Sequence, residues 1–479
     1  MKHATRLYTA VVQPFRAGTR LDLRLLAVFV LINGLVFANA YLHDPAIGYD
    51  SPSYFGYIRA LSNLRLVTPQ DSRESFSPPL PFAFPALLMA FTGTSLIRAA
   101  KLAQFLNVLL SMGLTWYLLR AAALLESRVS LRLGTLVFLG ILPVYYKSFA
   151  FVRGEPFVAC FAVVILYYLF LMVVRKQFTL TNAAILGLFM GLSALSRQWA
   201  ILLFPSVLLL LGYHWIRLPA WRTSIAKVIG LAFLLAAVVA GWFYIYLRMS
   251  HGSFTPFNRG SAAKFSFANQ PAAFYFGLSP KLLFEAPVRP SFTNEFVPTL
   301  YSEVWGDYWG YFSVAATDTR SSTHLNGRDL TDLLATGSRP TWLETNYYTI
   351  RGYLGRVNLV SLLPSALALI SMGFVTVAAL SKRGSLALIS DQRPAYGFLL
   401  LAILTTVAGY MWFLIMFPRL DKGDTIKATY LLHLFPFVAV MVGYALKHVE
   451  EKSPTLYRLL IGMLCAVCLH NAAAMVSHY

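Results

Sequence analysis

Residues 43–84 read HDPAIGYDSPSYFGYIRALSNLRLVTPQDSRESFSPPLPFAF, a polar stretch between two long apolar runs. The apolar run before it covers residues 23–42, and the next one covers residues 97–119. The stretch combines aspartates, a helix-start pattern, an amphipathic run and a proline cluster. We interpret it as a short structured loop at a membrane surface, because the runs on both sides are long enough to cross a hydrocarbon core.

The composition of the whole chain supports a membrane protein. The 479 residues are 57% hydrophobic and only 13% charged, whereas an ordinary soluble domain is about a quarter charged. We therefore predict an all-α polytopic membrane protein of about 11 transmembrane helices, with amphipathic helices in the loop of residues 43–96. The predicted spans are 23–42, 97–119, 131–149, 156–174, 182–196, 199–215, 225–247, 357–380, 395–417, 428–446 and 456–476.

The positive charges of the chain indicate its orientation. Lys and Arg number 40 against 20 Asp and Glu, and they recur in the N-terminus and in every second loop after it. Basic loops face the cytoplasm, so we expect a multi-pass protein of the plasma (inner) membrane with a cytoplasmic N-terminus. Membrane lipids rather than nucleic acid are the expected partners of these charges. The stretch of residues 43–84 then lies outside.

The same reasoning divides the chain into three parts. Residues 1–247 form an N-terminal transmembrane module, in which residues 43–96 are the first outer loop. Residues 248–356 form a long extracytoplasmic loop that is rich in aromatic residues and proline. We expect this loop to fold into short helices over the outer membrane face. Residues 357–479 form the C-terminal transmembrane helices.

Asp50 is the first candidate for chemistry. Ser51 and Pro52 are typical of an N-cap and a first helical residue, and Tyr54, Tyr57 and Ile58 then recur with a helical period. Asp50 would lie at the N-terminus of that helix, where the helix dipole favours an ionised carboxylate. The residues alone leave open whether Asp50 is a general base or only caps the helix, and Asp44 is a competing carboxylate.

Further charged residues fall at predicted ends of spans on the same side. Arg153 and Glu155 precede the fourth span, either as functional groups or as an ion pair at a helix start. Arg197 interrupts an apolar region and requires an anionic partner, for which a phosphate, Glu155 or Asp50 are candidates. The other outer cations are Lys147, Arg419, Lys422 and Lys427. His43 is interpreted as a surface histidine, and no spacing typical of a metal site occurs.

These motifs, in this order, resemble the GT-C superfamily of membrane glycosyltransferases. The likeness is to the branch that contains protein O-mannosyltransferases and lipid A aminoarabinose transferases. It rests on Tyr49-Asp50 with Tyr54, the Ser77-Pro78-Pro79-Leu80 element, Arg153-Gly154-Glu155, the glycine-rich run from Gly187 to Arg197, and the element from Lys427 through Tyr430 to Pro436. That family often has Asp-Glu where this chain has Asp50-Ser51.

The resemblance implies a transferase that uses a polyprenyl-phosphate sugar as donor and co-substrate, at the extracytoplasmic face. Asp50 would be the general base for an acceptor hydroxyl on a protein, a glycan or a lipid. Arg197 and Lys427 would stabilise the phosphate. Asp44, Tyr54, Arg153, Glu155 and Tyr430 would bind substrates. We expect no other cofactor and no metal, because arginine and lysine can stabilise a monophosphate.

Two other classes of function remain open at this point. A transporter or flippase for a lipid-linked or anionic substrate would also use basic residues at membrane depth. Such a protein would place its polar residues near the midplane and in broken helices, whereas here they gather at one face. In a non-catalytic scaffold, Asp50 would be dispensable.

Overall fold

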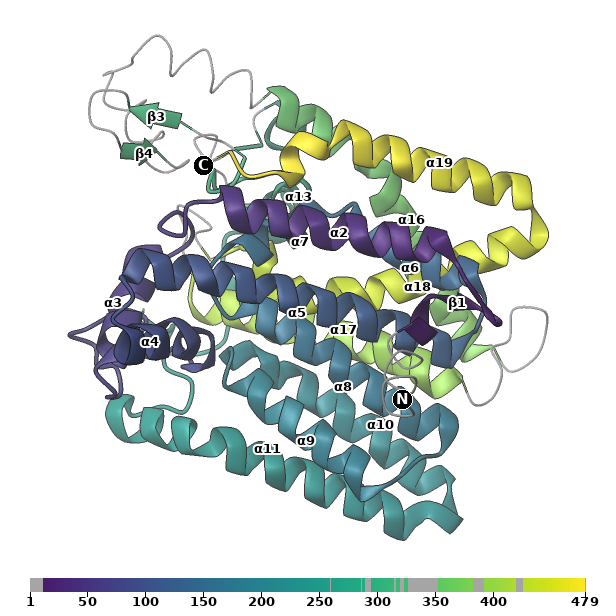
Figure 1. Ribbon diagram of the computed structural model, residues 1–479, viewed down its shortest axis with the longest axis horizontal. Coiled ribbons are helices and arrows are strands. Elements are labelled where there is room, and N and C mark those ends of the chain that lie inside the picture. Colours follow the sequence, from purple (N-terminus) through teal and green to yellow (C-terminus); the bar gives the residue numbers. More distant parts are fainter. Residues whose placement is uncertain are drawn as a thin grey trace.

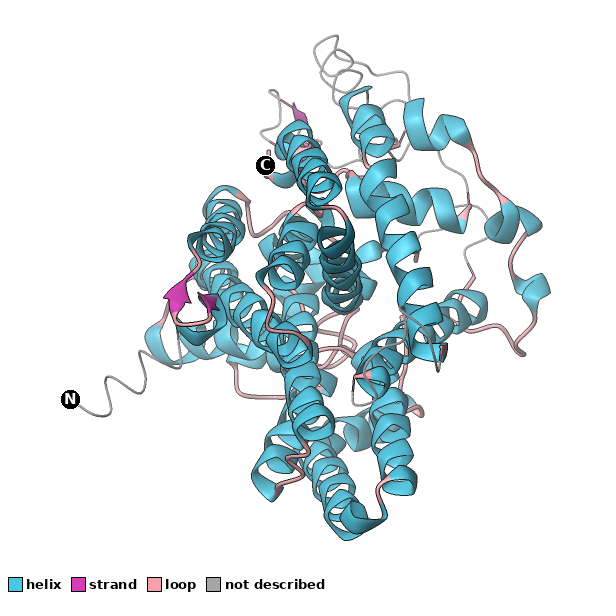
Figure 2. Ribbon diagram, turned by 90° about the vertical axis from the view of Figure 1, so that its right-hand side faces the viewer, coloured by secondary structure: helices cyan, strands magenta, loops and turns pink. Residues whose placement is uncertain are grey.

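The computed structural model describes residues 12–258, 260–285, 287–288, 294–313, 316–318, 323–325, 352–381, 392–418 and 425–478. It is a bundle of long helices, most of which run roughly horizontally in Figure 1, and Figure 2 shows many of them end-on. The described part of the chain is therefore all-α in class, as predicted. Arg419 and Lys422 lie outside the described residues, as does most of the long loop between residues 314 and 351.

The elements of the first half of the chain, in order, are η1 (Gln13–Phe15), β1 (Arg16–Ala17), β2 (Arg20–Leu21), α2 (Leu23–Leu42), α3 (Ser51–Ser62), α4 (Leu80–Thr92), α5 (Leu96–Leu125), α6 (Val129–Gly140), α7 (Pro143–Ala150), α8 (Glu155–Arg175), α9 (Leu180–Ala194), η2 (Gln198–Leu203), α10 (Phe204–Arg217), η3 (Pro219–Trp221) and α11 (Arg222–His251). The remaining elements are η4 (Phe267–Asn269), α12 (Ala272–Phe276), η5 (Lys281–Glu285), α13 (Phe296–Trp305), β3 (Ala316–Asp318), β4 (Thr323–Leu325), α16 (Leu362–Leu380), α17 (Arg393–Met416), η6 (Ala428–Leu434), α18 (Phe435–Lys452), α19 (Pro454–His470) and η7 (Ala472–Met475). β1 pairs with β2 and β3 with β4, both antiparallel, with Arg16 opposite Leu21 and Ala316 opposite Leu325.

Every predicted span coincides with an apolar helix. Within the described residues, eight helices are long and apolar enough to cross a membrane: Leu23–Leu42, Leu96–Leu125, Glu155–Arg175, Gln198–Arg217, Pro219–His251, Gly352–Leu380, Arg393–Met416 and Ala428–Lys452. The predicted spans at 182–196 and 456–476 correspond to shorter apolar helices, α9 and α19. The protein is thus a multi-pass helical membrane protein.

The predicted span at 131–149 is the one that differs in shape. It consists of α6 and α7, whose axes are bent by 63°. Pro143 begins α7 after the break, and proline cannot continue the backbone hydrogen-bond ladder of a preceding helix. The bend brings α7, with Lys147, against α13 and η6.

The core of the bundle lies around α8. This helix is buried along most of its length and packs on α5, α9 and η6. Gly187 and Gly191 let α9 lie close to α11, because a Cβ at Gly187 would stand 2.4 Å from the Ala232 carbonyl oxygen. The opposite face of α11 carries exposed Leu234, Val238, Trp242 and Ile245, a helical stripe suited to lipid.

Several connecting segments gather at one end of the bundle. Figure 1 shows α3, α4, the β3–β4 hairpin and the C-terminus at the left-hand end, whereas β1 and the start of α2 lie toward the right. The predicted amphipathic helix of the first outer loop is α3, which buries Tyr54, Tyr57 and Ile58. The described part of the long loop forms the expected short helices, η4, α12, η5 and α13.

Two local predictions in this region were wrong. Ser51 is the first residue of α3 rather than its N-cap, and Asp50 holds the cap position. Pro52 is then the second helical residue, where its missing N–H would have had no partner in the helix anyway. His43 is buried rather than at the surface, because the chain end returns to it. Its Nδ1 lies 2.7 Å from Ser477 Oγ and its Nε2 lies 2.9 Å from the Ile47 carbonyl oxygen.

Candidate active site

Asp50 connects the loop after α2 to α3 in a left-handed backbone conformation, with φ 58° and ψ 16°. Its carbonyl oxygen accepts the Tyr54 N–H at 3.1 Å, but its side chain makes no capping hydrogen bond. The carboxylate turns instead to Lys427, whose Nζ donates to Oδ2 at 3.3 Å. Asp50 thus occupies the cap position of α3, while its side chain is directed to Lys427 instead of the helix backbone. Asp50 is also 40% exposed at its side chain, against 10% for Lys427, so its carboxylate is accessible.

Beside this pair lies a buried cluster of two arginines and one glutamate. Arg153 donates to both oxygens of Glu155, from Nε at 2.5 Å and from Nη2 at 2.7 Å. Arg197 Nε lies 3.1 Å from Glu155 Oε1, and none of these three side chains is more than 4% exposed. The anionic partner of Arg197 is therefore Glu155. Gly154 permits this approach, because a Cβ there would stand 2.2 Å from the Ser196 carbonyl oxygen.

Arg197 also joins the segment between α2 and α4 to the bundle. Its Nη2 donates to the Tyr54 hydroxyl at 2.5 Å, and its Nη1 donates to Ser77 Oγ at 3.2 Å. The proline-cluster element, α3 and the Arg153–Glu155 turn thus meet at one guanidinium. Within the described residues, the buried Nη1 of Arg153 has no hydrogen-bond partner. That N–H is available to an acceptor on a ligand.

Aromatic rings surround Lys427. Its Nζ lies 4.6 Å from the ring centroid of Tyr49, 5.5 Å from that of Trp309 and 5.8 Å from that of Tyr430. Cations are attracted to such ring faces by the quadrupole of the π-system. The rings thereby hold the ammonium group in place while its charge faces Asp50.

Glu74 is a site residue that sequence reasoning missed. Its carboxylate accepts a hydrogen bond from Ser77 Oγ at 2.9 Å and from Asn258 Nδ2 at 3.3 Å, and the residue is 6% exposed. The sequence did contain a signal for Glu74, because an acid stands there three positions before Ser77 of the proline-cluster element. Asn258 comes from the long loop, so its contribution could be seen only in the fold.

The charges at the site set the protonation of Asp50 and Glu74. Partial removal of the Asp50 carboxylate from water raises its pKa, but the positive charges of Lys427 and Arg153 outweigh this effect and hold the pKa below its ordinary value of 3.8. Burial, followed by repulsion from Asp50, raises the pKa of Glu74 to about 7. Burial lowers the pKa of Lys427, but Asp50 more than offsets this and raises it. At neutral pH, Asp50 is therefore ionised beside a protonated Lys427.

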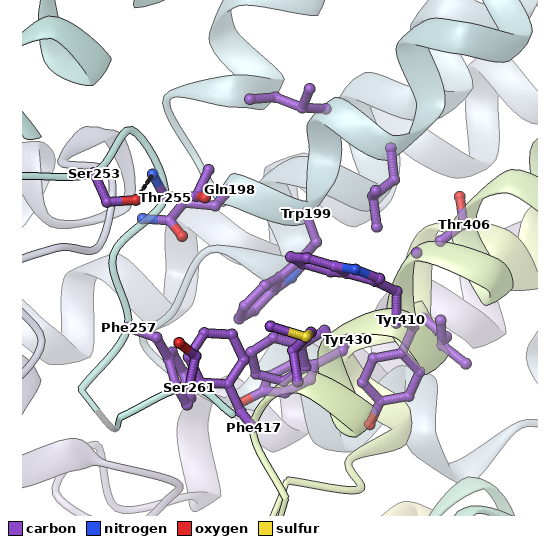
Figure 3. A pocket seen from close by; sticks show the side chains of 17 residues that line it. Gln198, Trp199, Ser253, Thr255, Phe257, Ser261, Thr406, Tyr410, Phe417 and Tyr430 are labelled. Carbon is purple, nitrogen blue, oxygen red and sulfur yellow. Dashed lines mark hydrogen bonds between the residues drawn. The ribbon is translucent and has the colours of Figure 1, made fainter. Parts of the chain in front are cut away.

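Two cavities flank this cluster. A polar cavity of about 790 Å³ is lined by residues of the segment between α2 and α4, which include Asp50, Pro52, Ser53, Gln70, Ser72 and Arg73, and by Tyr311 of the long loop. A mostly apolar cavity of about 360 Å³ lies between η2, α17, η6 and the residues Ser253, Thr255, Phe257 and Ser261. Figure 3 shows Trp199, Tyr430 and Tyr410 lining it, with Phe257 and Phe417 nearby.

The aromatic lining connects the apolar cavity to the cations. The ring of Trp199 lies 5.3 Å from the Arg197 guanidinium carbon, and the ring of Tyr430 lies 5.7 Å from that of Arg153. The two rings themselves are 4.3 Å apart. An amphipathic molecule with an apolar chain in this cavity would therefore place an anionic head next to the arginines.

The structure brings together seven of the eight residues predicted for the site: Asp50, Tyr54, Arg153, Glu155, Arg197, Lys427 and Tyr430. Asp44 lies apart from this network. Its Oδ1 accepts the Ala46 N–H at 2.8 Å, which closes a local turn. Within the described residues, no three or more His, Cys, Asp or Glu side chains are placed to hold a metal ion.

Comparison with known proteins gives a structural likeness only. No protein-family model matches the chain, and no curated protein matches it. The apo oligosaccharyltransferase of Archaeoglobus fulgidus aligns with 95% of this chain at a TM-score of 0.51 and 13% identity. ArnT from Cupriavidus metallidurans bound to undecaprenyl phosphate aligns with 90% of this chain and 79% of its own length, at a TM-score of 0.37 and 14% identity.

The chain spans 56% of the length of the archaeal oligosaccharyltransferase. At 13% identity, the likeness establishes the arrangement of helices and leaves the chemistry to be argued from the site. The chain therefore shares its arrangement of helices with the archaeal oligosaccharyltransferase, and its motifs predicted a helical membrane fold of that kind.

Proposed function

We propose that this protein is a membrane glycosyltransferase. It moves a sugar from a polyprenyl-phosphate donor to an acceptor hydroxyl at the extracytoplasmic face, with Asp50 as general base. The observation that carries the proposal is the position of Asp50. Its exposed carboxylate lines a polar cavity and lies 3.3 Å from the ammonium group of Lys427, beside buried arginines and an apolar cavity.

The charge at the site favours an anionic donor. Three cations, Arg153, Arg197 and Lys427, pair with two carboxylates, Asp50 and Glu155. Glu74 adds less than a full negative charge near neutrality, because its pKa is about 7. Uncompensated positive charge out of water is costly, so a phosphate would be stabilised there.

Each of the two cavities would bind one of the two substrates. The apolar cavity suits the first part of a polyprenyl chain, with the phosphate beside Arg197, Arg153 and Lys427. The polar cavity suits the acceptor, because Asp50 lies in its lining. The sugar would lie between them, with its anomeric carbon within reach of a hydroxyl held by Asp50. Preorganised groups of this kind lower the barrier by holding the reacting atoms together.

The reaction is then a nucleophilic substitution at the anomeric carbon. Asp50 accepts the proton of the acceptor hydroxyl as the oxygen forms a new glycosidic bond. The bond between the anomeric carbon and the phosphate oxygen breaks, and the phosphate leaves with the electron pair. Arg197 and Lys427 stabilise the charge that develops on the leaving group. A monophosphate can be stabilised by these cations, so we propose that the enzyme needs no metal.

The orientation follows from the loop charges. The protein would lie in the plasma (inner) membrane. Because basic residues recur in every second loop, its N-terminus would be cytoplasmic and α3 would lie at the extracytoplasmic face. A transporter is less well supported. The site charges stand at the ends of helices rather than in the middle, since Glu155 begins α8, Arg197 precedes η2 and Lys427 precedes η6.

The experiment is sugar transfer by purified protein in lipid nanodiscs. A radiolabelled polyprenyl-phosphate sugar is supplied with glycan, glycolipid and protein fractions of the cell envelope, and the free polyprenyl phosphate and labelled acceptor are measured. The proposal expects both products to form together. In proteoliposomes, a flippase would move the labelled donor across the bilayer without cleaving the sugar–phosphate bond, and that outcome would contradict the proposal.

A further inference from the structure

A second buried ion pair lies beside the base, outside the cluster described above. Lys147 Nζ is 2.7 Å from Glu303 Oε1 and also donates to the Glu303 carbonyl oxygen at 3.0 Å. Neither side chain is more than 1% exposed. Lys147 belongs to α7 and Glu303 to α13, so the pair attaches the long outer loop to the bundle.

Tyr49 links this ion pair to the residue that carries the chemistry. Its hydroxyl donates to Glu303 Oε1, the same oxygen that Lys147 approaches. Tyr49 is 2% exposed and is the residue directly before Asp50. The face of its ring lies 4.6 Å from Lys427 Nζ, and Lys427 in turn donates to Asp50. One tyrosine therefore contacts both the ion pair and the partner of the base.

The backbone of Asp50 needs such support. A left-handed conformation is uncommon at a non-glycine residue and persists where the surroundings fix it. On the C-terminal side, the Asp50 carbonyl is fixed by the Tyr54 N–H at the start of α3. On the N-terminal side, the anchored side chain of Tyr49 is the corresponding support, because Tyr49 is packed against Phe151, Trp309 and Tyr311.

Stability alone is a weak reason for the ion pair. Taking two charges out of water costs about as much as their attraction returns, so a buried pair is often no more stabilising than apolar residues of the same size. What the pair does provide is a fixed acceptor for the Tyr49 hydroxyl. A buried polar contact of this kind specifies one geometry.

We infer that Lys147 and Glu303 are positioning residues, which act through Tyr49 to hold Asp50 against Lys427. The inference rests on the proposed function, since it concerns the placement of the proposed base. It makes the described segment of residues 294–313 part of the catalytic apparatus, although none of these residues touches the reacting atoms in the proposed mechanism.

The test uses Tyr49→Phe, which removes one hydroxyl oxygen and keeps the ring that faces Lys427. The matched control is Tyr301→Phe, which removes a tyrosine hydroxyl from α13, where it donates to the Asn358 carbonyl. The full-length proteins are compared in nanodiscs by kcat, by the KM for donor and by the pH profile of kcat/KM. The charged groups that act on Asp50 are Lys427, Arg153, Arg197 and Glu74, and neither substitution alters them.

For Tyr49→Phe, we expect kcat to fall about tenfold or more with the KM for donor nearly unchanged, because a small misplacement of a catalytic group slows the chemical step. A carboxylate that has moved away from Lys427 loses attraction to its charge, so the acid limb of the profile should shift to higher pH by roughly half a unit or more. Tyr301→Phe should leave the profile unchanged. Glu303→Gln combined with Tyr49→Phe should cost less than the sum of the two single effects.

An unchanged kcat and acid limb in folded Tyr49→Phe protein would overturn the inference. Loss of kcat with an unmoved acid limb would also overturn it, since that result indicates general loosening of the fold. Asp50→Asn separates this failure from a failure of the proposed function. If Asp50→Asn is inactive while Tyr49→Phe is normal, only the positioning role is lost. If Asp50→Asn is active, the base assignment itself is wrong.

Discussion

Replacing Arg197 with alanine tests the donor site in most detail. In the structure its guanidinium donates to Tyr54 and Ser77 and pairs with Glu155, and it lies beside the Trp199 ring of the apolar cavity. A hydrogen bond to a charged group contributes roughly 1.5–3 kcal/mol. Losing one such contact to the donor phosphate should therefore weaken donor binding by about 10- to 150-fold.

Arg197→Ala should lower the free energy of unfolding by less than the loss of one member of an isolated buried ion pair would. Removing one member of a buried ion pair destabilises a protein by roughly 3–5 kcal/mol, but Glu155 keeps both hydrogen bonds from Arg153. Arg132→Ala is the matched control. Arg132 is also a buried arginine, and it donates to the carbonyl oxygens of Pro14 and Arg16, near the start of the chain.

The assay is equilibrium binding of a polyprenyl phosphate to purified protein in nanodiscs, with thermal unfolding measured in parallel. Arg197→Ala should lose affinity while it stays folded, and Arg132→Ala should lose only thermal stability. A folded Arg197→Ala protein with unchanged affinity would refute the phosphate contact. Equal loss of affinity in both variants would show that the effect is not local to the site.

Three further predictions concern charge, metal and packing. Glu74 gains negative charge as pH rises through about 7, so donor affinity should fall over that range. Glu74→Gln should remove this pH dependence of donor affinity. If the dependence persists in the variant, another group is responsible for it. Sugar transfer should survive EDTA, and a loss that manganese or magnesium restores would refute the metal-free mechanism. Gly154→Ala should lower thermal stability by about 1–3 kcal/mol, because its Cβ would stand 2.2 Å from the Ser196 carbonyl oxygen. Gly212→Ala, whose Cβ would meet nothing within 4 Å, is the control, and equal stability of the two variants would contradict the packing argument.

Much of the fold was predictable because membrane spans are encoded locally. An apolar run of sufficient length is enough to place a helix, so all eleven predicted ranges coincide with helices. The bend between α6 and α7 was missed, although Gly140 and Pro143 are local signals for it. The start of α3 was misplaced by one residue, because Ser51 and Asp50 are both residues that favour the N-cap position.

The candidate site was only partly predictable, because its contacts join distant residues. The sequence left three candidates for the anionic partner of Arg197. Only the fold identified Glu155, whose Oε1 lies 3.1 Å from Arg197 Nε. Lys427 lies 377 positions from Asp50, and no pattern in the sequence pairs them. Glu303 received no role because its partners, Tyr49 and Lys147, are fixed by the packing of α13 rather than by any motif.

Turnover by Asp50→Asn is the most direct measurement of the proposed role of Asp50 as general base. A general base contributes about 10²–10⁴-fold to a rate, so sugar transfer should fall by at least two orders of magnitude while the protein stays folded and binds donor. Asp22→Asn is the control, since Asp22 also stands at the start of a helix, α2, where its side chain does cap the backbone. Asp44→Asn tests the competing carboxylate. Near wild-type turnover in Asp50→Asn, or loss of turnover in Asp44→Asn alone, would contradict the assignment of Asp50 as general base.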